Sequence, residues 1–239
     1  MFVFAALIGL CFGSFANVVI YRLPQGKSVV SPPSHCTACN VYLKWYDLMP
    51  VVSWLALRGK CRYCNTKITA RYPVTEVMCA VIFTIIAIRH GADVYVLPLW
   101  CAAFILLCVA WIDWDTMKIP DSLLIVAAIA GVCWVLSSST LTWQDAVLGV
   151  LAGALPLLLI DCMVRLIAKK PGFGFGDVKL MAAAGLFLGW HGIYIAYMAA
   201  FIAGGIFGVY LLATKKAERG SYLPFGPFLC FGVLLSLLI

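Results

Sequence analysis

The chain has 239 residues, of which 64% are hydrophobic and 11% are charged, and its formal net charge is +7. Soluble globular domains have about 45–50% apolar and about 25% charged residues. This composition excludes a disordered chain, a collagen, a coiled coil and a small disulfide scaffold. It predicts an all-α polytopic membrane protein, with room for seven or eight transmembrane helices at roughly 20 residues each.

The apolar runs, taken in chain order, predict eight transmembrane helices. The first run is uncharged and lacks a basic start, so we expect a retained helix and not a cleaved signal peptide. The sixth run is short and rich in Ala and Gly, which is typical of a partial span. Continuous apolar runs, in place of alternating ones, argue against a transmembrane β-barrel. The expected spans are residues 1–20, 74–90, 95–112, 122–137, 146–168, 178–190, 192–213 and 223–239.

The positions of Lys and Arg orient these helices, because cytoplasmic loops carry an excess of both. Sixteen of the 17 fall on one side of the expected topology, and only Arg89 lies near the other side. We therefore expect the basic side to be cytoplasmic and both chain ends to lie outside. Glycines four residues apart, which let helix backbones approach closely, mark candidate helix contacts. These pairs are Gly9 with Gly13, Gly149 with Gly153, and Gly204 with Gly208.

Residues 21–72 are the one long polar segment, and we expect them to form a cytoplasmic domain between the first helix, residues 1–20, and a helical core, residues 73–239. This segment has eight Lys and Arg residues and a single acid, Asp47. Anionic lipid headgroups attract such a segment. No nucleic-acid-binding motif accompanies the charge, so we expect membrane lipids, and not nucleic acid, as its partner.

Four of the 11 cysteines form two Cys-x-x-Cys pairs in this segment, Cys36 with Cys39 and Cys61 with Cys64, and 21 residues separate the pairs. This spacing is typical of a four-thiolate zinc site. A loop of about 50 residues buries little apolar surface, so a structural metal can supply its folding energy. Two disulfides are the alternative, but a reducing cytoplasm disfavours them. A catalytic zinc is disfavoured because four thiolates leave no open position.

Carboxylates at the cytoplasmic helix ends are the candidate catalytic groups, since charged groups near a bilayer core are costly and usually functional. Asp113 and Asp115 follow the third run, Asp121 opens the fourth, and Asp177 ends a Gly-x-Gly-Asp sequence. Two carboxylates at close range share one proton, so one can activate water while the other polarises a peptide carbonyl. The glycines before Asp177 let a substrate backbone or a partner helix approach.

Several charged residues also have plainer interpretations. Asp121 after Ile-Pro is typical of a helix N-cap or first-turn acid, and we favour that interpretation. Asp161 lies four residues before Arg165, as in a helical ion pair. Lys179 is either a cytoplasmic anchor or a group that tunes Asp177. From the residues alone, Asp113 and Asp115 cannot be separated as the first member of the pair. Acids in the first turn of a helix account for Glu76 and for Asp145, which follows Thr142.

These motifs, in this order and almost end to end, resemble the type IV prepilin peptidases, also called prepilin leader peptidases. The matching segments are Gly13 to Pro24, the two Cys-x-x-Cys pairs with Asp47 to Pro50 and Leu57 to Cys61, Arg71 to Glu76, Ile112 to Asp121, Gly174 to Lys179, and Pro224 to Phe228. The resemblance implies an intramembrane aspartic endopeptidase of the bacterial inner membrane. It would cut the basic leader from prepilins or pseudopilins at the cytoplasmic face, after a Gly. The implied catalytic pair is Asp113 and Asp177.

Many members of this family also methylate the new amino terminus with S-adenosylmethionine. The resemblance associates that activity with the amino-terminal motif and the zinc domain, and it makes Glu76 and Asp47 candidate contributors. A peptidase without methyltransferase activity is one alternative. A non-catalytic assembly scaffold is another, and it predicts that Asp113→Asn and Asp177→Asn are silent. A transporter or channel would place its acids near helix midpoints, whereas these lie at helix ends.

Overall fold

The structure is a computed structural model that describes residues 2–91, 93–138, 141–168, 174–214 and 223–239. Within these ranges every regular element is a helix, and only two isolated β-bridges occur, which confirms the all-α prediction. The helices are α1 (Phe2–Arg22), η1 (Leu23–Gln25), η2 (Trp45–Asp47), α2 (Val52–Ala56), α3 (Arg71–His90), η3 (Val94–Val96), α4 (Leu97–Thr116), α5 (Asp121–Ser137), α6 (Trp143–Ala168), α7 (Phe175–Ala213) and α8 (Gly226–Leu238).

Five apolar segments in the described residues are long enough to cross a membrane, which supports a multi-pass membrane protein. They are Phe2–Gln25, Arg71–His90, Val94–Thr116, Trp143–Ile167 and Phe175–Ala213. The other two apolar helices are shorter, since α5 has 17 residues and α8 has 13. A span needs about 20 residues, with a range of about 17–25. The count of eight spans therefore stays a prediction.

The sixth and seventh expected spans, 178–190 and 192–213, together form α7, which has 39 residues. The helix is interrupted at Gly189, where φ is 61° and ψ is −175°. Glycine adopts this conformation readily because it has no Cβ, and other residues rarely do. The break lies one residue before the end of the first of these two expected spans.

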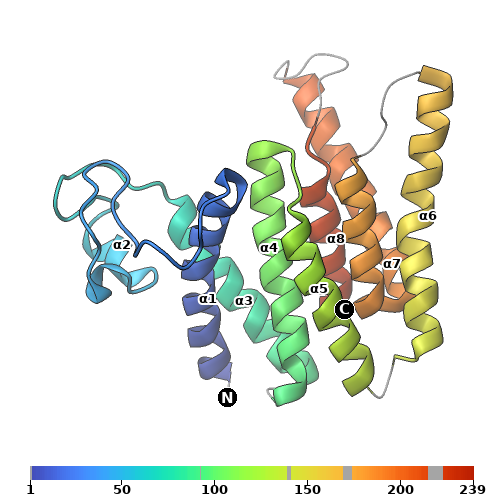
Figure 1. Ribbon diagram of the computed structural model, residues 1–239, viewed down its shortest axis with the longest axis horizontal. Helices are drawn as coiled ribbons and strands as arrows, with labels where there is room; N and C mark the ends of the chain where they lie inside the picture. Colours follow the sequence, from blue (N-terminus) through green and yellow to red (C-terminus); the bar gives the residue numbers. More distant parts are fainter. Residues whose placement is uncertain (1, 92, 139–140, 169–173, 215–222) are drawn as a thin grey trace. The chain divides into compact units, whose positions relative to one another are not determined.

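The chain forms two compact units, Met1–Val96 and Leu97–Ile239. In the first unit α1 packs along α3, and the loop segment with α2 lies beside these two helices (Figure 1). The small-residue pair Gly9 and Gly13 makes this contact, because a Cβ on either would lie 2.5 Å from a backbone Cα of α3. α3 thus belongs to the same unit as the cysteine pairs.

In the second unit α7 contacts α5, α6 and α8, and α4 contacts α5 and α8 (Figure 1). Gly149 and Gly153 face α7, and a Cβ at Gly149 would lie 2.5 Å from the carbonyl oxygen of Gly185. This predicted contact is confirmed. The third pair is confirmed only at Gly204, since a Cβ at Gly208 would have no neighbour within 4 Å.

Candidate functional sites

Asp113 lies in the last turn of α4 and is 6% exposed. Its Oδ2 atom accepts a hydrogen bond of 3.0 Å from the backbone N–H of Gly226, the first residue of α8. Asp115, two residues later, is exposed. Burial therefore separates the two acids that the sequence left equivalent, and Asp113 is the one held inside the second unit.

Asp177 lies in the first turn of α7 and is 8% exposed. Its backbone N–H donates to the carbonyl oxygen of Gly174 at 3.0 Å, which fixes the start of the helix. Gly176 packs on Ile119 of the α4–α5 connection, and a Cβ there would lie 3.0 Å from the Cβ of Ile119. The glycine therefore lets the α4–α5 connection approach. Gly172 and Phe173, which precede this motif, lie outside the described residues.

The carboxyl groups of Asp113 and Asp177 lie close enough to interact electrostatically, and both also interact with the thiol of Cys230 in α8. The side chain of Cys230 is completely buried. Three helices, α4, α7 and α8, thus bring two carboxyl groups together in the interior of the second unit. Such a pair can share a proton.

Lys179 of α7 forms an ion pair with Asp121, the first residue of α5, at 2.8 and 2.9 Å to the two carboxylate oxygens. The ammonium group also lies 5.1 Å from the ring centre of Phe175. Asp121 is a first-turn acid, as expected, but Lys179 binds it and not Asp177. The ion pair joins the starts of α5 and α7 near the buried carboxyl pair.

The four paired cysteines of the first unit converge, with their Sγ atoms all within 4.8 Å of one another. All four are free thiols, so the disulfide alternative is not realised. A tetrahedral zinc with Zn–S bonds of about 2.3 Å requires S···S distances of about 3.8 Å. The Sγ atoms of Cys36 and Cys64 are 3.8 Å apart, which fits this geometry.

The two cysteine loops have the same backbone hydrogen bonds. The N–H of Asn40 donates to the oxygen of Cys36, and the N–H of Asn65 donates to the oxygen of Cys61. Both asparagines adopt a left-handed conformation, with φ of 56° and 58°. The first cysteine of each loop also donates to the residue after its asparagine, at 3.0 and 2.9 Å. The repeated Cys-x-x-Cys-Asn sequence is the signal for this repeat, which the sequence analysis missed.

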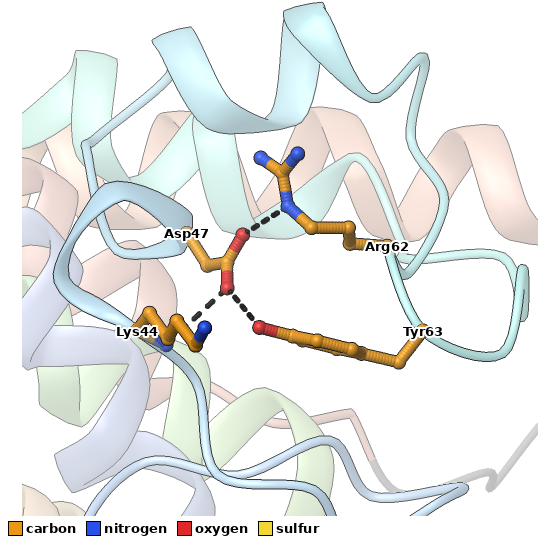
Figure 2. Close-up of polar contacts among 4 residues, drawn as sticks. All are labelled: Lys44, Asp47, Arg62 and Tyr63. Carbon is orange, nitrogen blue, oxygen red and sulfur yellow. Dashed lines mark hydrogen bonds and ion pairs between the residues drawn. The ribbon is translucent and has the colours of Figure 1, made fainter.

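Asp47 links the two halves of this loop segment (Figure 2). Its side chain is 3% exposed and accepts hydrogen bonds from Arg62 Nε at 2.7 Å, from Tyr63 Oη at 3.0 Å and from the N–H of Lys44 at 3.2 Å. Burial alone would raise the pKa of Asp47, but the bonds from Arg62 and Tyr63 outweigh it and hold the pKa below its ordinary value. Both carboxylate oxygens are therefore occupied.

A cavity of about 330 Å³ lies in the first unit among α1, the start of α3 and the loop segment. This volume is at the lower end of ligand pockets, about 300–1,000 Å³. Two carboxyl groups, Asp47 and Glu76, contribute to its wall together with Arg22. The aromatic members of the wall are Tyr21, Trp54, Tyr63 and Tyr72.

Glu76 lies in the second turn of α3 and is 7% exposed. Its Oε2 atom accepts a hydrogen bond of 2.7 Å from the backbone N–H of Val51. Val51 has a φ of 61°, which is a strained conformation for a β-branched residue. The sequence interpretation of Glu76 as a first-turn acid is therefore wrong. The residue fixes the loop segment to α3.

The amino-terminal motif holds the same loop from the α1 side. Asn17 donates through Nδ2 to the carbonyl oxygens of Gly13 and Tyr72, both at 3.2 Å. Arg22, which is 7% exposed, donates to the carbonyl oxygens of Ser28 at 3.3 Å and Pro33 at 3.4 Å. Buried polar side chains of the motif thus set the wall of the cavity.

Comparison with known proteins gives two family matches. Residues 7–90 match the bacterial peptidase A24 N-terminal domain, and residues 99–209 match the type IV leader peptidase family. The chain is 33% identical to a prepilin leader peptidase/N-methyltransferase of Pseudomonas putida, over 98% of this chain and 89% of the relative. Similar proteins of that description occur in Aeromonas salmonicida (strain A449), 31% identical over 97% of this chain and 88% of the relative, and in Neisseria gonorrhoeae, 33% identical over 94% and 86%. No solved structure matches the chain.

Proposed function

The chain belongs to the prepilin leader peptidase/N-methyltransferase family, and we propose that it removes the basic leader from type IV prepilins or pseudopilins by aspartic-peptidase chemistry. The observation that carries this proposal is the burial of Asp113 and Asp177 within electrostatic range of each other. Both lie at helix ends, where a peptide bond close to the membrane surface is within reach. The Gly-rich start of α7 adds little bulk there.

In this mechanism the two carboxyl groups share one proton and act as a unit. The ionised member takes a proton from water, the water oxygen bonds to the carbonyl carbon, and the protonated member gives its proton to the carbonyl oxygen. The resulting diol collapses as the C–N bond breaks. The leaving amine receives the proton that came from water, and the second carboxyl recovers its own. No covalent enzyme intermediate forms.

The membrane arrangement that we propose has eight crossings, with the two halves of α7 counted separately at Gly189. The end of α4, the start of α5 and the start of α7 then share the cytoplasmic face of the bacterial inner membrane. The excess of Lys and Arg on that side supports this orientation. Anionic lipids are the proposed partners of the basic loop segment, and they offset the repulsion between a basic leader and a basic face.

We further propose that the first unit methylates the new amino terminus. Three observations support this: a cavity of about 330 Å³, two carboxyl groups in its wall, and several aromatic rings. S-adenosylmethionine supplies an electrophilic methyl group on a sulfonium cation. Glu76 and the aromatic rings suit that cation, and Arg22 suits a carboxylate. Asp47 and Glu76 also keep the loop segment in place.

The role proposed for zinc is structural. Cys36, Cys39, Cys61 and Cys64 can supply four thiolates, whose Sγ atoms lie within 4.8 Å of one another, and the pair Cys36 and Cys64 has the spacing that a tetrahedral ion requires. The metal would hold the two cysteine loops together, because this segment buries little apolar surface of its own. Its chemistry is confined to neutralising and fixing the thiolates.

The experiment that tests the function is one intact-mass assay in lipid with a prepilin and S-adenosylmethionine. Loss of the leader plus one methyl group supports both activities, and loss of the leader alone supports the peptidase without methyltransferase. Asp113→Asn and Asp177→Asn should each abolish cleavage. Asp161→Asn is the matched control, because its ion pair with Arg165 at 2.6 Å lies within α6. Full cleavage by either of the first two variants would show that the carboxyl pair is not catalytic.

A further inference from the structure

The first residue of α8 makes direct contact with the buried carboxyl pair. The backbone N–H of Gly226 donates to Oδ2 of Asp113 at 3.0 Å, in the interior of the second unit. No side-chain cap competes at this helix end, because Phe225 is the N-cap residue. The sequence analysis placed Gly226 in a motif of the family, Pro224 to Phe228, but gave it no role.

The same position has no room for a side chain. A Cβ at Gly226 would lie 2.5 Å from Oδ2 of Asp113 and 2.9 Å from its Cγ. Real Cβ atoms do not approach so closely, so any other residue would displace either the carboxyl group or the start of α8. Residue 226 therefore combines a hydrogen-bond donor with the smallest possible bulk against one member of the pair.

The hydrogen bond also constrains where the shared proton resides. A backbone N–H can only donate, so Oδ2 of Asp113 must present a lone pair. An N–H at a helix N-terminus also stabilises negative charge on the atom that it meets. Asp177 lies at the start of its own helix, near the Gly174 backbone, so the helix dipole does not distinguish the two acids. The carboxyl of Asp177 also interacts with the backbone of Gly174, so each acid has one backbone donor. What the bond from Gly226 does fix is the oxygen of Asp113 that can carry a proton, which is Oδ1.

We propose that Gly226 is a positioning residue that fixes the orientation of the Asp113 carboxyl, so that Oδ2 is held by the backbone N–H and Oδ1 faces the reaction. Every proton that Asp113 takes up or gives in the mechanism proposed above then passes through Oδ1. This inference rests on the proposed peptidase function and deepens it, because it assigns the two oxygens of Asp113 different roles.

The first test is Gly226→Ala, assayed for prepilin cleavage in lipid. We expect kcat to fall about 100-fold, as for a misplacement of about 1 Å, with KM changed less than about threefold. Gly205→Ala is the control, because a Cβ there has no neighbour within 4 Å. Thermal unfolding of both variants shows whether they fold. A folded Gly226→Ala variant with the kcat of the wild type would overturn the proposal.

The second test removes the donor and adds no atom, by placing glycolic acid at position 226 so that an ester oxygen replaces the N–H. A lost hydrogen bond to a charged group corresponds to a drop in kcat of roughly 10- to 100-fold. The acid limb of the kcat–pH profile should move to higher pH, which a purely structural defect would not cause. If this ester variant keeps the kcat and pH profile of the wild type, the role of glycine is steric and the proposal is wrong.

The wild type and Asp113→Asn distinguish a failure of the proposed peptidase function from a failure of the role proposed for Gly226. If the wild type does not cleave prepilin, the proposed function itself is wrong. If the wild type cleaves, Asp113→Asn is inactive and the ester variant is fully active, the peptidase function stands. Only the role proposed for Gly226 is then wrong. If the wild type is active and the ester variant is impaired with a shifted acid limb, both the peptidase function and the role of Gly226 are supported.

Discussion

In the first compact unit Asp47 accepts hydrogen bonds on both carboxylate oxygens, whereas in the second unit Asp113 accepts one, on Oδ2. The carboxyl of Asp177 interacts with the backbone of Gly174, just before the start of its own helix. A carboxylate with every oxygen occupied holds a loop in place, and one with a free oxygen can exchange a proton. The comparison supports a structural role for Asp47 and the reactive role proposed for Asp113, although all three side chains are shielded from solvent.

The loop segment of the first unit also differs from the helices of the second unit in how it packs. Helices of the second unit approach through glycines, as at Gly149 and Gly185. The loop segment of the first unit has two isolated β-bridges, two short helical turns and the five-residue α2. We infer that the loop segment depends on polar contacts and a metal, while the second unit depends on backbone packing. Each difference can be tested separately.

The largest expected effect is loss of the metal. Cys61→Ser, or removal of zinc with a chelator, should release one zinc per chain and unfold the loop segment, because structural zinc provides apparent free energies of about 10–16 kcal/mol in zinc-finger peptides. Zinc content and hydrogen exchange of residues 30–68 measure this. Cys133→Ser is the control, since that cysteine is exposed in α5 and outside the cluster. A fully folded, metal-free loop would contradict the structural role.

The next effect is a separation of the two activities. Asp177→Asn should lower cleavage by about 1,000-fold or more and still methylate a pilin supplied without its leader. Glu76→Ala should keep cleavage and lose methylation. The variant leaves the N–H of Val51 without its acceptor, at a cost of about 1–3 kcal/mol in the wall of the cavity. Both are read by intact mass. If both variants lose cleavage and methylation together, the two activities do not reside in separate units.

Sequence patterns predicted the features that depend on residues close in the chain. The ion pair of Asp161 with Arg165 is confirmed at 2.6 Å. Asp145 lies in the first turn of α6, where Thr142 accepts from its N–H at 3.2 Å. The Cys-x-x-Cys spacing correctly predicted a cluster of four thiols able to hold a metal. Helical periodicity and tight turns carry this information directly.

Contacts between distant residues were not predicted. The bonds from Gly226 to Asp113 and from Val51 to Glu76 join residues 113 and 25 positions apart. Periodicity states which residues are apolar, but it does not state which helix ends meet. The partner of Lys179, which is Asp121, was missed for the same reason. The catalytic roles of Asp113 and Asp177 stay predictions, since geometry alone does not test chemistry.

A smaller effect is expected from the glycines that join α6 to α7. A Cβ at Gly153 would clash with the carbonyl group of Met181, so Gly153→Ala should destabilise the second unit by about 1–3 kcal/mol, as overpacking does. Thermal unfolding in lipid measures the loss. Gly208→Ala is the matched control, because it adds the same atom where no neighbour lies within 4 Å. Equal stabilities of the two variants would show that α6 and α7 do not depend on this contact.

The smallest expected effect is the pH dependence of Asp47. Its pKa is lower in the folded chain than in an unfolded one, so the stability that it contributes is present above its ordinary pKa of about 4 and is lost as the pH falls through the folded value. The charged and titratable groups facing it are Arg62 and Tyr63, with Lys44 binding through its backbone. Zinc release against pH should therefore differ between the wild type and Asp47→Asn mainly above pH 4, with the wild type more stable, and the two curves should converge in acid. Asp93→Asn, an exposed acid of the same unit, controls for net charge. If Asp47→Asn stays as stable as the wild type at neutral pH, the hydrogen bonds to Asp47 do not stabilise the loop, and its two occupied oxygens would no longer distinguish it from the carboxyl groups of the second unit.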